Sequence, residues 1–320
     1  MSPPVRLGTR GSPLALWQTE HVRQLLTEQR PDLEYEIVVI ATTGDRLLDT
    51  PLPAIGGKGV FTAELEEALR ERSIDLAVHS LKDLPTEPSP GLVIGAILER
   101  ADSADVLVSR GGYGIRSLPK RANVGTSSSR RAAQLLYERS DLQIIDLRGN
   151  LGTRLRKALD PSGPYDAVVV ARAALERLGR VELVSEVVSE DVMLPAPGQG
   201  ALAVQCRGEE DGLGLVRGIS HVPSELETTA ERSFLERLGG GCAVPVAARA
   251  RLEEDGWLSI RGRVLPPDGS TKVEVEAREL VSLQVGGRQA AYDAGSRLAV
   301  EALSQGAAEL LGGTTGQAGA

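Results

Sequence analysis

One acidic residue, Asp83, is a candidate for acid/base chemistry because of its position after a predicted strand. Asp83 lies in residues 79–85 (HSLKDLP), directly after the apolar run of residues 74–78. That run predicts a β-strand, and ligands of open α/β sheets bind in the crevice outside the carboxyl ends of the strands. A carboxylate there could move protons or stabilise positive charge, although it could equally be a solvated surface group.

Three predicted strand-to-helix turns have the composition of anion sites. They are residues 8–12 (GTRGS), 125–131 (GTSSSRR) and 147–150 (LRGN). Each couples the free N–H groups of a helix start with hydroxyl or guanidinium groups, which suits a carboxylate or a phosphate. In any one turn the hydroxyls could simply cap the helix while the arginines face solvent. Three such turns together favour an anion-binding cleft.

The two cysteines differ in their surroundings. Cys206 ends the apolar run ALAVQC and is interpreted as a buried small hydrophobic residue. Cys242 follows three glycines, which leave its sulfur approachable, so a covalent role and a structural one both stay open. Neither cysteine has the spacing of a metal site, and no metal is expected.

A long glycine- and proline-rich segment, residues 43–59, separates two predicted helical regions. Long loops in compact domains often act as lids, and a surface connection without a role is the alternative. No Walker pattern can be written there, so nucleotide binding gains no support.

The elements that would position these groups fall into three blocks. Short apolar runs alternate with helical patterns in the first two, which predicts βαβ units and mostly parallel sheets. From about residue 219 a helix, three strands and a closing helix predict an α+β block with a three-stranded antiparallel sheet. We therefore expect two α/β domains and a C-terminal α+β domain. The expected boundaries are residues 1–99 with 194–218, residues 100–193, and residues 219–320.

Composition excludes several classes of function. The 320 residues carry a net charge of -8, which argues against sequence-independent binding of nucleic acid. No apolar run approaches the roughly 20 residues that span a membrane. The N-terminal residues lead directly into a strand pattern rather than a signal peptide, so a cytoplasmic protein is expected. No large apolar stripe demands a partner subunit, and a monomer is expected.

Seven motifs, taken in order, resemble those of the porphobilinogen deaminase family. They are residues 8–18, 42–66, 75–85, 123–131, 147–154, 194–207 and 230–245. The resemblance implies two α/β domains of the periplasmic-binding-protein type, a third α+β domain, and a dipyrromethane cofactor joined to Cys242 by a thioether. It implies a transferase of tetrapyrrole biosynthesis that adds four porphobilinogen molecules head to tail with loss of ammonia, then releases hydroxymethylbilane by hydrolysis.

The resemblance also implies roles for individual residues. Substrate contacts are implied for Arg10, Ser12, Arg148, Arg154 and Arg177. Cofactor contacts are implied for Lys82, Asp83, Thr126, Ser128, Arg130 and Arg131. Lys58 and Phe61 border the expected lid. Each pyrrole carries two carboxylates, so the arginine-bearing turns fit this chemistry. Asp83 is the expected catalytic residue, because one carboxylate can accept pyrrole N–H bonds, stabilise positive charge and shuttle protons.

Departures from the family pattern are few. Gly239 replaces an acidic residue, Ala243 replaces a glutamine, and Arg172 stands where small apolar residues are usual. A non-enzymatic anion-binding protein of the periplasmic type would explain the first two domains but leaves Cys242 without a role. An enzyme acting on another carboxylated metabolite, with Asp83 as general base, is a second alternative.

Overall fold

The computed structural model describes residues 3–46, 62–239, 244–284 and 286–312. The chain divides into two compact units. The first comprises residues 1–102, 173–179 and 200–225, and the second comprises residues 103–172, 180–199 and 226–320. The second unit contains two separate sheets, and the division into three domains stays a prediction.

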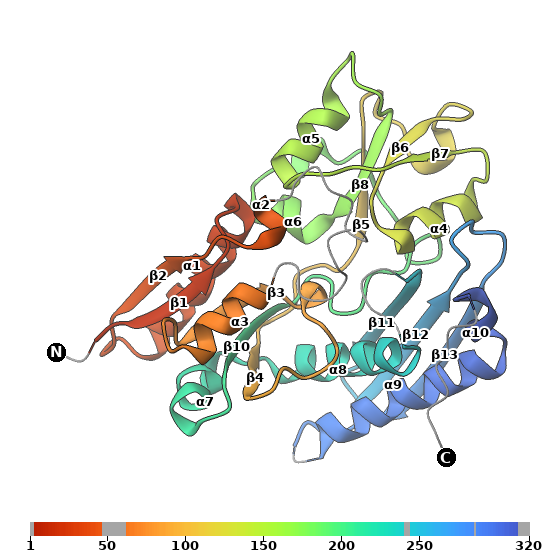
Figure 1. Ribbon diagram of the computed structural model, residues 1–320. Helices are drawn as coiled ribbons and strands as arrows, with labels where there is room; N and C mark the ends of the chain where they lie inside the picture. The colour runs from red at the N-terminus through yellow and green to blue at the C-terminus, as the bar shows by residue number, and fades with distance from the viewer. Residues whose placement is uncertain (1–2, 47–61, 240–243, 285, 313–320) are drawn as a thin grey trace. The chain divides into compact units, whose positions relative to one another are not determined.

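A mixed five-stranded sheet forms the centre of the first unit, in the order β2-β1-β3-β10-β4 (Figure 1). The strands are β1 (Val5–Thr9), β2 (Tyr35–Val39), β3 (Leu76–Ser80), β4 (Leu92–Ile97) and β10 (Leu202–Arg207). β1 runs parallel to β2 and β3, as expected for βαβ units. β10 is antiparallel to both β3 and β4, so the chain returns to this sheet late and the sheet is mixed.

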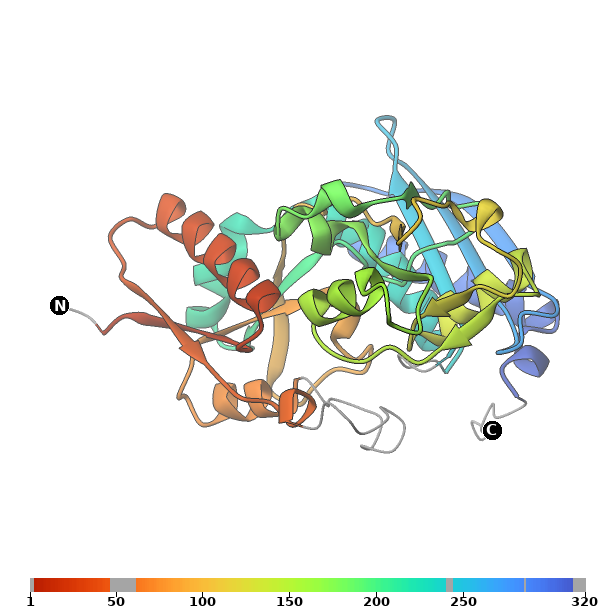
Figure 2. The same ribbon diagram turned by 90° about the horizontal axis from the view of Figure 1, so that it is seen from above.

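Helices cover both faces of this sheet. The helical elements of the first unit are α1 (Pro13–Gln29), α2 (Thr43–Arg46), α3 (Ala63–Arg70), α6 (Arg172–Arg177, whose first residue falls in the second unit), α7 (Glu210–Val216) and the short 3-10 turns η2 (Leu81–Asp83) and η5 (Arg217–Ile219). α1 packs Val22 and Leu26 against Leu76, and Figure 2 shows it in red along the sheet. α3 packs Leu65 against Ala77 on the other face. Alternate residues of one strand thus serve opposite layers.

The second unit holds another mixed sheet, in the order β7-β6-β8-β5-β9. Its elements are β5 (Asp105–Ser109), β6 (Asn123–Gly125), α4 (Ser129–Glu138), β7 (Gln143–Ile145), α5 (Leu151–Leu159), β8 (Ala167–Ala171), β9 (Glu186–Val187) and the 3-10 turns η3 (Ile115–Ser117) and η4 (Val181–Leu183). β6 is parallel to β7 and β8, whereas β5 is antiparallel to β8 and β9. The carboxyl ends of β6 and β7 therefore meet at one edge.

The C-terminal part of the second unit confirms the predicted three-stranded antiparallel sheet. It contains α8 (Val222–Arg237), β11 (Val246–Leu252), β12 (Trp257–Val264), β13 (Val273–Leu280), α9 (Gly287–Ser304) and α10 (Ala307–Leu310). α8 and α9 cover one face of the sheet (Figure 1). Phe234, Ile260 and Leu298 meet in the core between them. The predicted fold class, α/β with a C-terminal α+β part, is confirmed.

No helix in the described ranges is both long enough and apolar enough to cross a membrane.

Candidate functional site

Asp83 lies in the 3-10 turn η2 that follows β3. Leu81 and Leu84 are buried on either side of it and anchor the turn. The Leu81 N–H donates to the carbonyl of Ala201 at 3.0 Å, and the Leu84 N–H donates to the carbonyl of Leu81 at 3.1 Å. Because the two leucines point inward, Lys82 is left half-buried and Asp83 exposed. The backbone that carries the carboxylate is anchored, and the carboxylate itself is accessible to a ligand.

Arg10 and Ser12 lie at the same edge of the sheet as Asp83. They follow β1, which is parallel to β3 and next to it. The Ser12 hydroxyl also accepts the N–H of Ala15 at 3.2 Å, which caps α1. The first turn therefore has the structural role that the sequence left open, and it also brings Arg10 to the sheet edge that carries Asp83.

His79 lies directly before this edge but differs sharply from Asp83. Its ring is buried, and burial lowers its pKa to about 4. Interactions with Gln205, Glu66 and Asp83 oppose this shift without offsetting it. His79 is therefore neutral at neutral pH. That leaves Asp83 as the accessible acid/base group of residues 79–85.

Arg177 ends α6 and belongs to the first unit as well. Its Nη2 donates to the carbonyl of Gly200 at 2.7 Å, and its guanidinium carbon lies 5.8 Å from the ring centre of Trp17. Burial lowers the pKa of Arg177 to about 10, so it stays charged at neutral pH. The first unit thus supplies Arg177 together with the groups at the ends of β1 and β3.

The turn after β6 contains the hydroxyls predicted to contact a cofactor. Ser128 caps α4 by accepting the Arg131 N–H at 3.4 Å. The Thr126 hydroxyl accepts the Ser128 N–H at 3.1 Å. Ser127 binds both the N–H and the carbonyl of Leu147, at 3.1 and 2.7 Å. These bonds join the turn to its neighbour after β7.

Arg148 and Arg154 belong to that neighbouring turn and to α5. Asn150 caps α5 by accepting the Thr153 N–H at 3.0 Å. Arg154 Nε donates to the carbonyl of Gly149 at 2.8 Å. Gly149 has φ 113°, a conformation that strains other residues, so glycine is required here. The second sheet thus brings both arginines near the hydroxyl turn.

Arg130 and Arg131 are buried and share one carboxylate. Arg130 Nη1 donates to Asp105 at 2.7 Å, and Arg131 Nε and Nη2 donate to it at 3.0 and 2.7 Å. Gln199 also donates to Asp105, at 3.0 Å. Burial lowers the pKa of Arg130. Two guanidinium groups and one carboxylate leave this cluster with one excess positive charge, which favours an anionic ligand.

Sequence reasoning missed Asp105 and Gln199, both of which are buried. The signal for Asp105 was present, because a lone carboxylate opens the apolar run DVLV and a buried charge needs a partner. The sequence held no comparable signal for Gln199, whose role depends on tertiary contacts.

Three predicted site residues, Lys58, Phe61 and Cys242, lie outside the described residues. Cys206 is buried in β10, and burial raises its pKa to about 11. Its interpretation as a buried small hydrophobic residue is confirmed. Within the described ranges, no group of three or more His, Cys, Asp or Glu residues is arranged to hold a metal ion.

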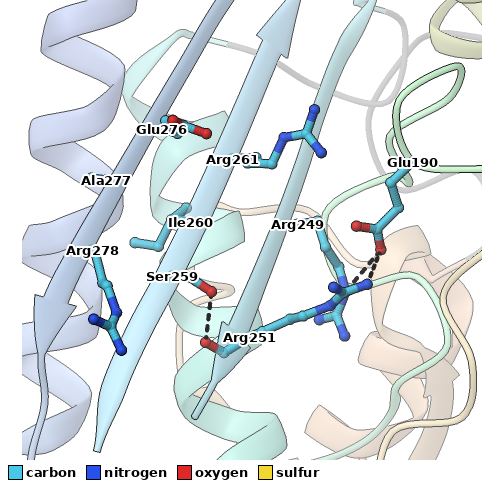
Figure 3. Close-up of a pocket in the computed structure, with 9 residues that line it drawn as sticks. All are labelled: Glu190, Arg249, Arg251, Ser259, Ile260, Arg261, Glu276, Ala277 and Arg278. Atoms are coloured by element: carbon cyan, nitrogen blue, oxygen red, sulfur yellow. Dashed lines mark hydrogen bonds and ion pairs between the residues drawn. The ribbon is translucent and has the colours of Figure 1, made fainter.

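A surface pocket of about 440 Å³ lies on the exposed face of the C-terminal sheet (Figure 3). Neighbouring carboxylates form ion pairs with its arginines and compensate their charge. Arg251 pairs with Glu190 at 2.7 Å, and Arg261 pairs with Asp191 and Glu274 at 3.2 and 2.7 Å. None of the predicted site residues lines it. This pocket is a charge-compensated hollow rather than the candidate site.

Two family models match the chain. Residues 5–213 match "Porphobilinogen deaminase, dipyromethane cofactor binding domain", and residues 225–304 match "Porphobilinogen deaminase, C-terminal domain".

Curated relatives agree with these models. The chain is 51% identical to the porphobilinogen deaminase of Syntrophomonas wolfei over 269 residues, covering 84% of this chain and 87% of the relative. It is 48% identical to that of Pelotomaculum thermopropionicum over 308 residues, covering 96% of each.

Among solved structures, the chain is similar to the periplasmic aliphatic sulphonate binding protein SsuA from Escherichia coli. The identity is 16%, the coverage is 73% of this chain and 70% of that one, and the TM-score is 0.38. A TM-score this low supports no conclusion about this chain.

Proposed function

The chain belongs to the porphobilinogen deaminase family, and from this premise we propose that it joins four porphobilinogen molecules head to tail, with loss of ammonia at each addition, and releases hydroxymethylbilane by hydrolysis. It is a transferase of tetrapyrrole biosynthesis. The observation that carries the proposal is the match of both family models over residues 5–213 and 225–304. The non-enzymatic alternative is not favoured, since those models cover the cofactor-binding and C-terminal parts alike.

The cofactor is dipyrromethane, in keeping with the matched cofactor-binding domain. When bound, it supplies the primer to which porphobilinogen units are added. We propose that the Cys242 sulfur holds it through a thioether. The buried cluster of Arg130, Arg131 and Asp105 carries one excess positive charge and suits the carboxylates of such a group. Thr126, Ser128 and Lys82 would supply further hydrogen bonds.

Asp83 is the proposed catalytic residue. Its turn is anchored by the buried Leu81 and Leu84 and its side chain is exposed, so the carboxylate can accept hydrogen bonds from pyrrole N–H groups. A fixed negative charge stabilises positive charge that develops on a pyrrole nitrogen, and it can take up and return a proton. His79 is buried and neutral, so it does not compete for this role.

The remaining arginines are proposed to hold the carboxylates of the growing chain. They are Arg10, Arg148, Arg154 and Arg177, together with the hydroxyl of Ser12. Guanidinium groups bind carboxylates in a bidentate manner, which fixes the orientation of each ring as well as its charge. Lys58 and Phe61 are proposed to border a lid over the substrate.

We further propose that the protein acts as a cytoplasmic monomer without nucleic-acid partners. The net charge of -8 supports the last point, because non-specific binding to nucleic acid needs a basic surface.

A turnover assay tests the proposed function. The purified holoenzyme should convert porphobilinogen to hydroxymethylbilane and release four ammonia molecules per bilane. Asp83→Asn should keep its fold, because the side chain is exposed, and lose roughly 100-fold or more of the turnover rate. Asp32→Asn, another exposed aspartate, is the matched control and should keep full turnover. Absence of ammonia release by the parent, or normal turnover in Asp83→Asn, would contradict the proposal.

A further inference from the structure

Two aromatic side chains of α1 stack on each other next to the proposed substrate contacts. Trp17 and His21 are one helical turn apart, their ring centres are 5.3 Å apart, and their planes differ by 18°. Trp17 stays 39% exposed, whereas its neighbour Gln18 is buried and donates to Ser80 Oγ at 2.9 Å. The buried neighbours fix the helix against the sheet, so the exposed ring pair has a fixed position.

The guanidinium of Arg177 lies over the Trp17 ring of this pair. Its central carbon is 5.8 Å from the centre of the Trp17 ring, within the range of a cation–π interaction. Its one hydrogen bond to another described residue goes to the carbonyl of Gly200, at 2.7 Å. A guanidinium has five N–H donors, so most of them remain for a ligand.

Arg177 also differs from the other buried arginines in its charge balance. Arg130 and Arg131 share the carboxylate of Asp105. No carboxylate in the described part of the chain pairs with Arg177. The neighbouring Glu176 acts on its charge only through space, without an ion pair, so the guanidinium is available to an incoming anion.

We propose that Trp17 and His21 form a positioning platform that holds the Arg177 guanidinium ready to bind a carboxylate of the pyrrole chain. This inference rests on the proposed function and assigns two residues that the sequence analysis did not single out. Trp17 and His21 are positioning residues, because they act through Arg177. A long arginine side chain loses rotamer freedom when it binds, and a side chain already held by the ring loses less.

Steady-state kinetics of the holoenzyme test the platform. Trp17→Leu removes the aromatic face, whereas Trp17→Phe keeps one. We expect Trp17→Leu to raise KM for porphobilinogen roughly 3- to 30-fold, the range expected for a lost cation–π contact, with kcat changed less than about twofold. Trp17→Phe should stay within about twofold of the parent in both constants. An unchanged KM in Trp17→Leu, or an equal loss in the two variants, overturns the proposal.

A second measurement, the pKa of His21, tests the platform without relying on catalytic turnover. The pKa of His21 is lowered by burial and by the nearby charge of Arg177, and Glu28 opposes the shift. The chain has three histidines, so NMR can follow the His21 ring, identified by its loss in His21→Asn. Arg177→Leu should raise the pKa of His21. Trp17→Leu removes burial as well as the support of Arg177, so it should raise the pKa of His21 more in the parent than in an Arg177→Leu background, where the guanidinium is already gone. Trp17→Phe should leave it unchanged.

The two readouts separate the two claims. A parent protein without turnover would contradict the proposed function, while the pKa of His21 would still report whether Trp17 positions Arg177. If Trp17→Leu raises the pKa of His21 equally in the parent and in Arg177→Leu, the platform does not exist, whatever the turnover.

Discussion

Asp83 and His79 show how strongly local environment decides the chemistry of a residue. They lie four positions apart, yet His79 is enclosed by the sheet and α3, whereas Asp83 projects from a turn. Burial removes the charge from His79 at neutral pH. Asp83 is exposed between two buried leucines, so it is accessible on an anchored turn. A single short motif therefore contains one structural and one accessible ionisable group.

The pKa of His79 predicts a pH dependence of stability. Its pKa is about 4 in the folded protein against an ordinary value of 6.5, so the unfolded chain binds the proton more tightly. The stabilisation is present above about pH 6.5 and is lost as pH falls toward 4, by on the order of 3 kcal/mol.

Urea unfolding at pH 7 and pH 4 measures this effect. His79→Leu should lack the His79 contribution, so the parent should lose more stability than the variant over the same interval. His221→Leu, which removes a histidine and leaves His79 in place, serves as the control. Parallel losses in the parent and His79→Leu would show that His79 is not buried as a neutral group.

At the scale of elements, sequence patterns located the strands and helices well. Strand β3 ends at Ser80, next to the expected position, because an apolar run between a helix and a turn is a strong signal. The antiparallel insertion of β10 between β3 and β4 was harder to predict from the sequence. Pairing partners depend on contacts between distant segments, which no local pattern encodes.

The start of α8 is a second instructive difference. Residues 224–227 (SELE) read as a capping box, but the helix already begins at Val222. His221 accepts the Ser224 N–H through Nδ1 at 3.4 Å, and the Ser224 hydroxyl instead accepts the Arg100 N–H at 2.9 Å. His221 therefore caps the helix locally, three residues before the position that the spacing indicated, and the Ser224 hydroxyl is used in a contact with a distant segment.

The close packing of β12 against α8 predicts a specific sensitivity. A Cβ added at Gly262 would lie 2.3 Å from the ring of Phe234, so Gly262→Ala should destabilise the protein by about 1–3 kcal/mol in urea unfolding. Phe234→Leu should partly relieve the added clash, so the double variant should lose less than the sum of the two single losses. Strict additivity would mean that the two residues are not in contact.

At the scale of the whole molecule, the distribution of charge determines the binding of an anionic substrate more than the net charge does. The chain is acidic overall, with 44 acidic and 36 basic residues, yet arginines cluster at the turns after β6 and β7. A polyanionic substrate is compatible with an acidic protein, because binding depends on the field at the site. Composition correctly indicated an ordinary globular chain. The sharing of Asp105 by Arg130 and Arg131 required the folded structure.

The covalent primer is the central claim at this scale, since it distinguishes a chain-building transferase from a reversible anion binder. Intact mass measurement of the purified holoenzyme under denaturing conditions tests it most directly. The account predicts an adduct of two pyrrole units on the parent and on Cys206→Ala, whose sulfur is buried, and no adduct on Cys242→Ala. An unmodified parent that still makes bilane, or an adduct that persists in Cys242→Ala, would contradict it.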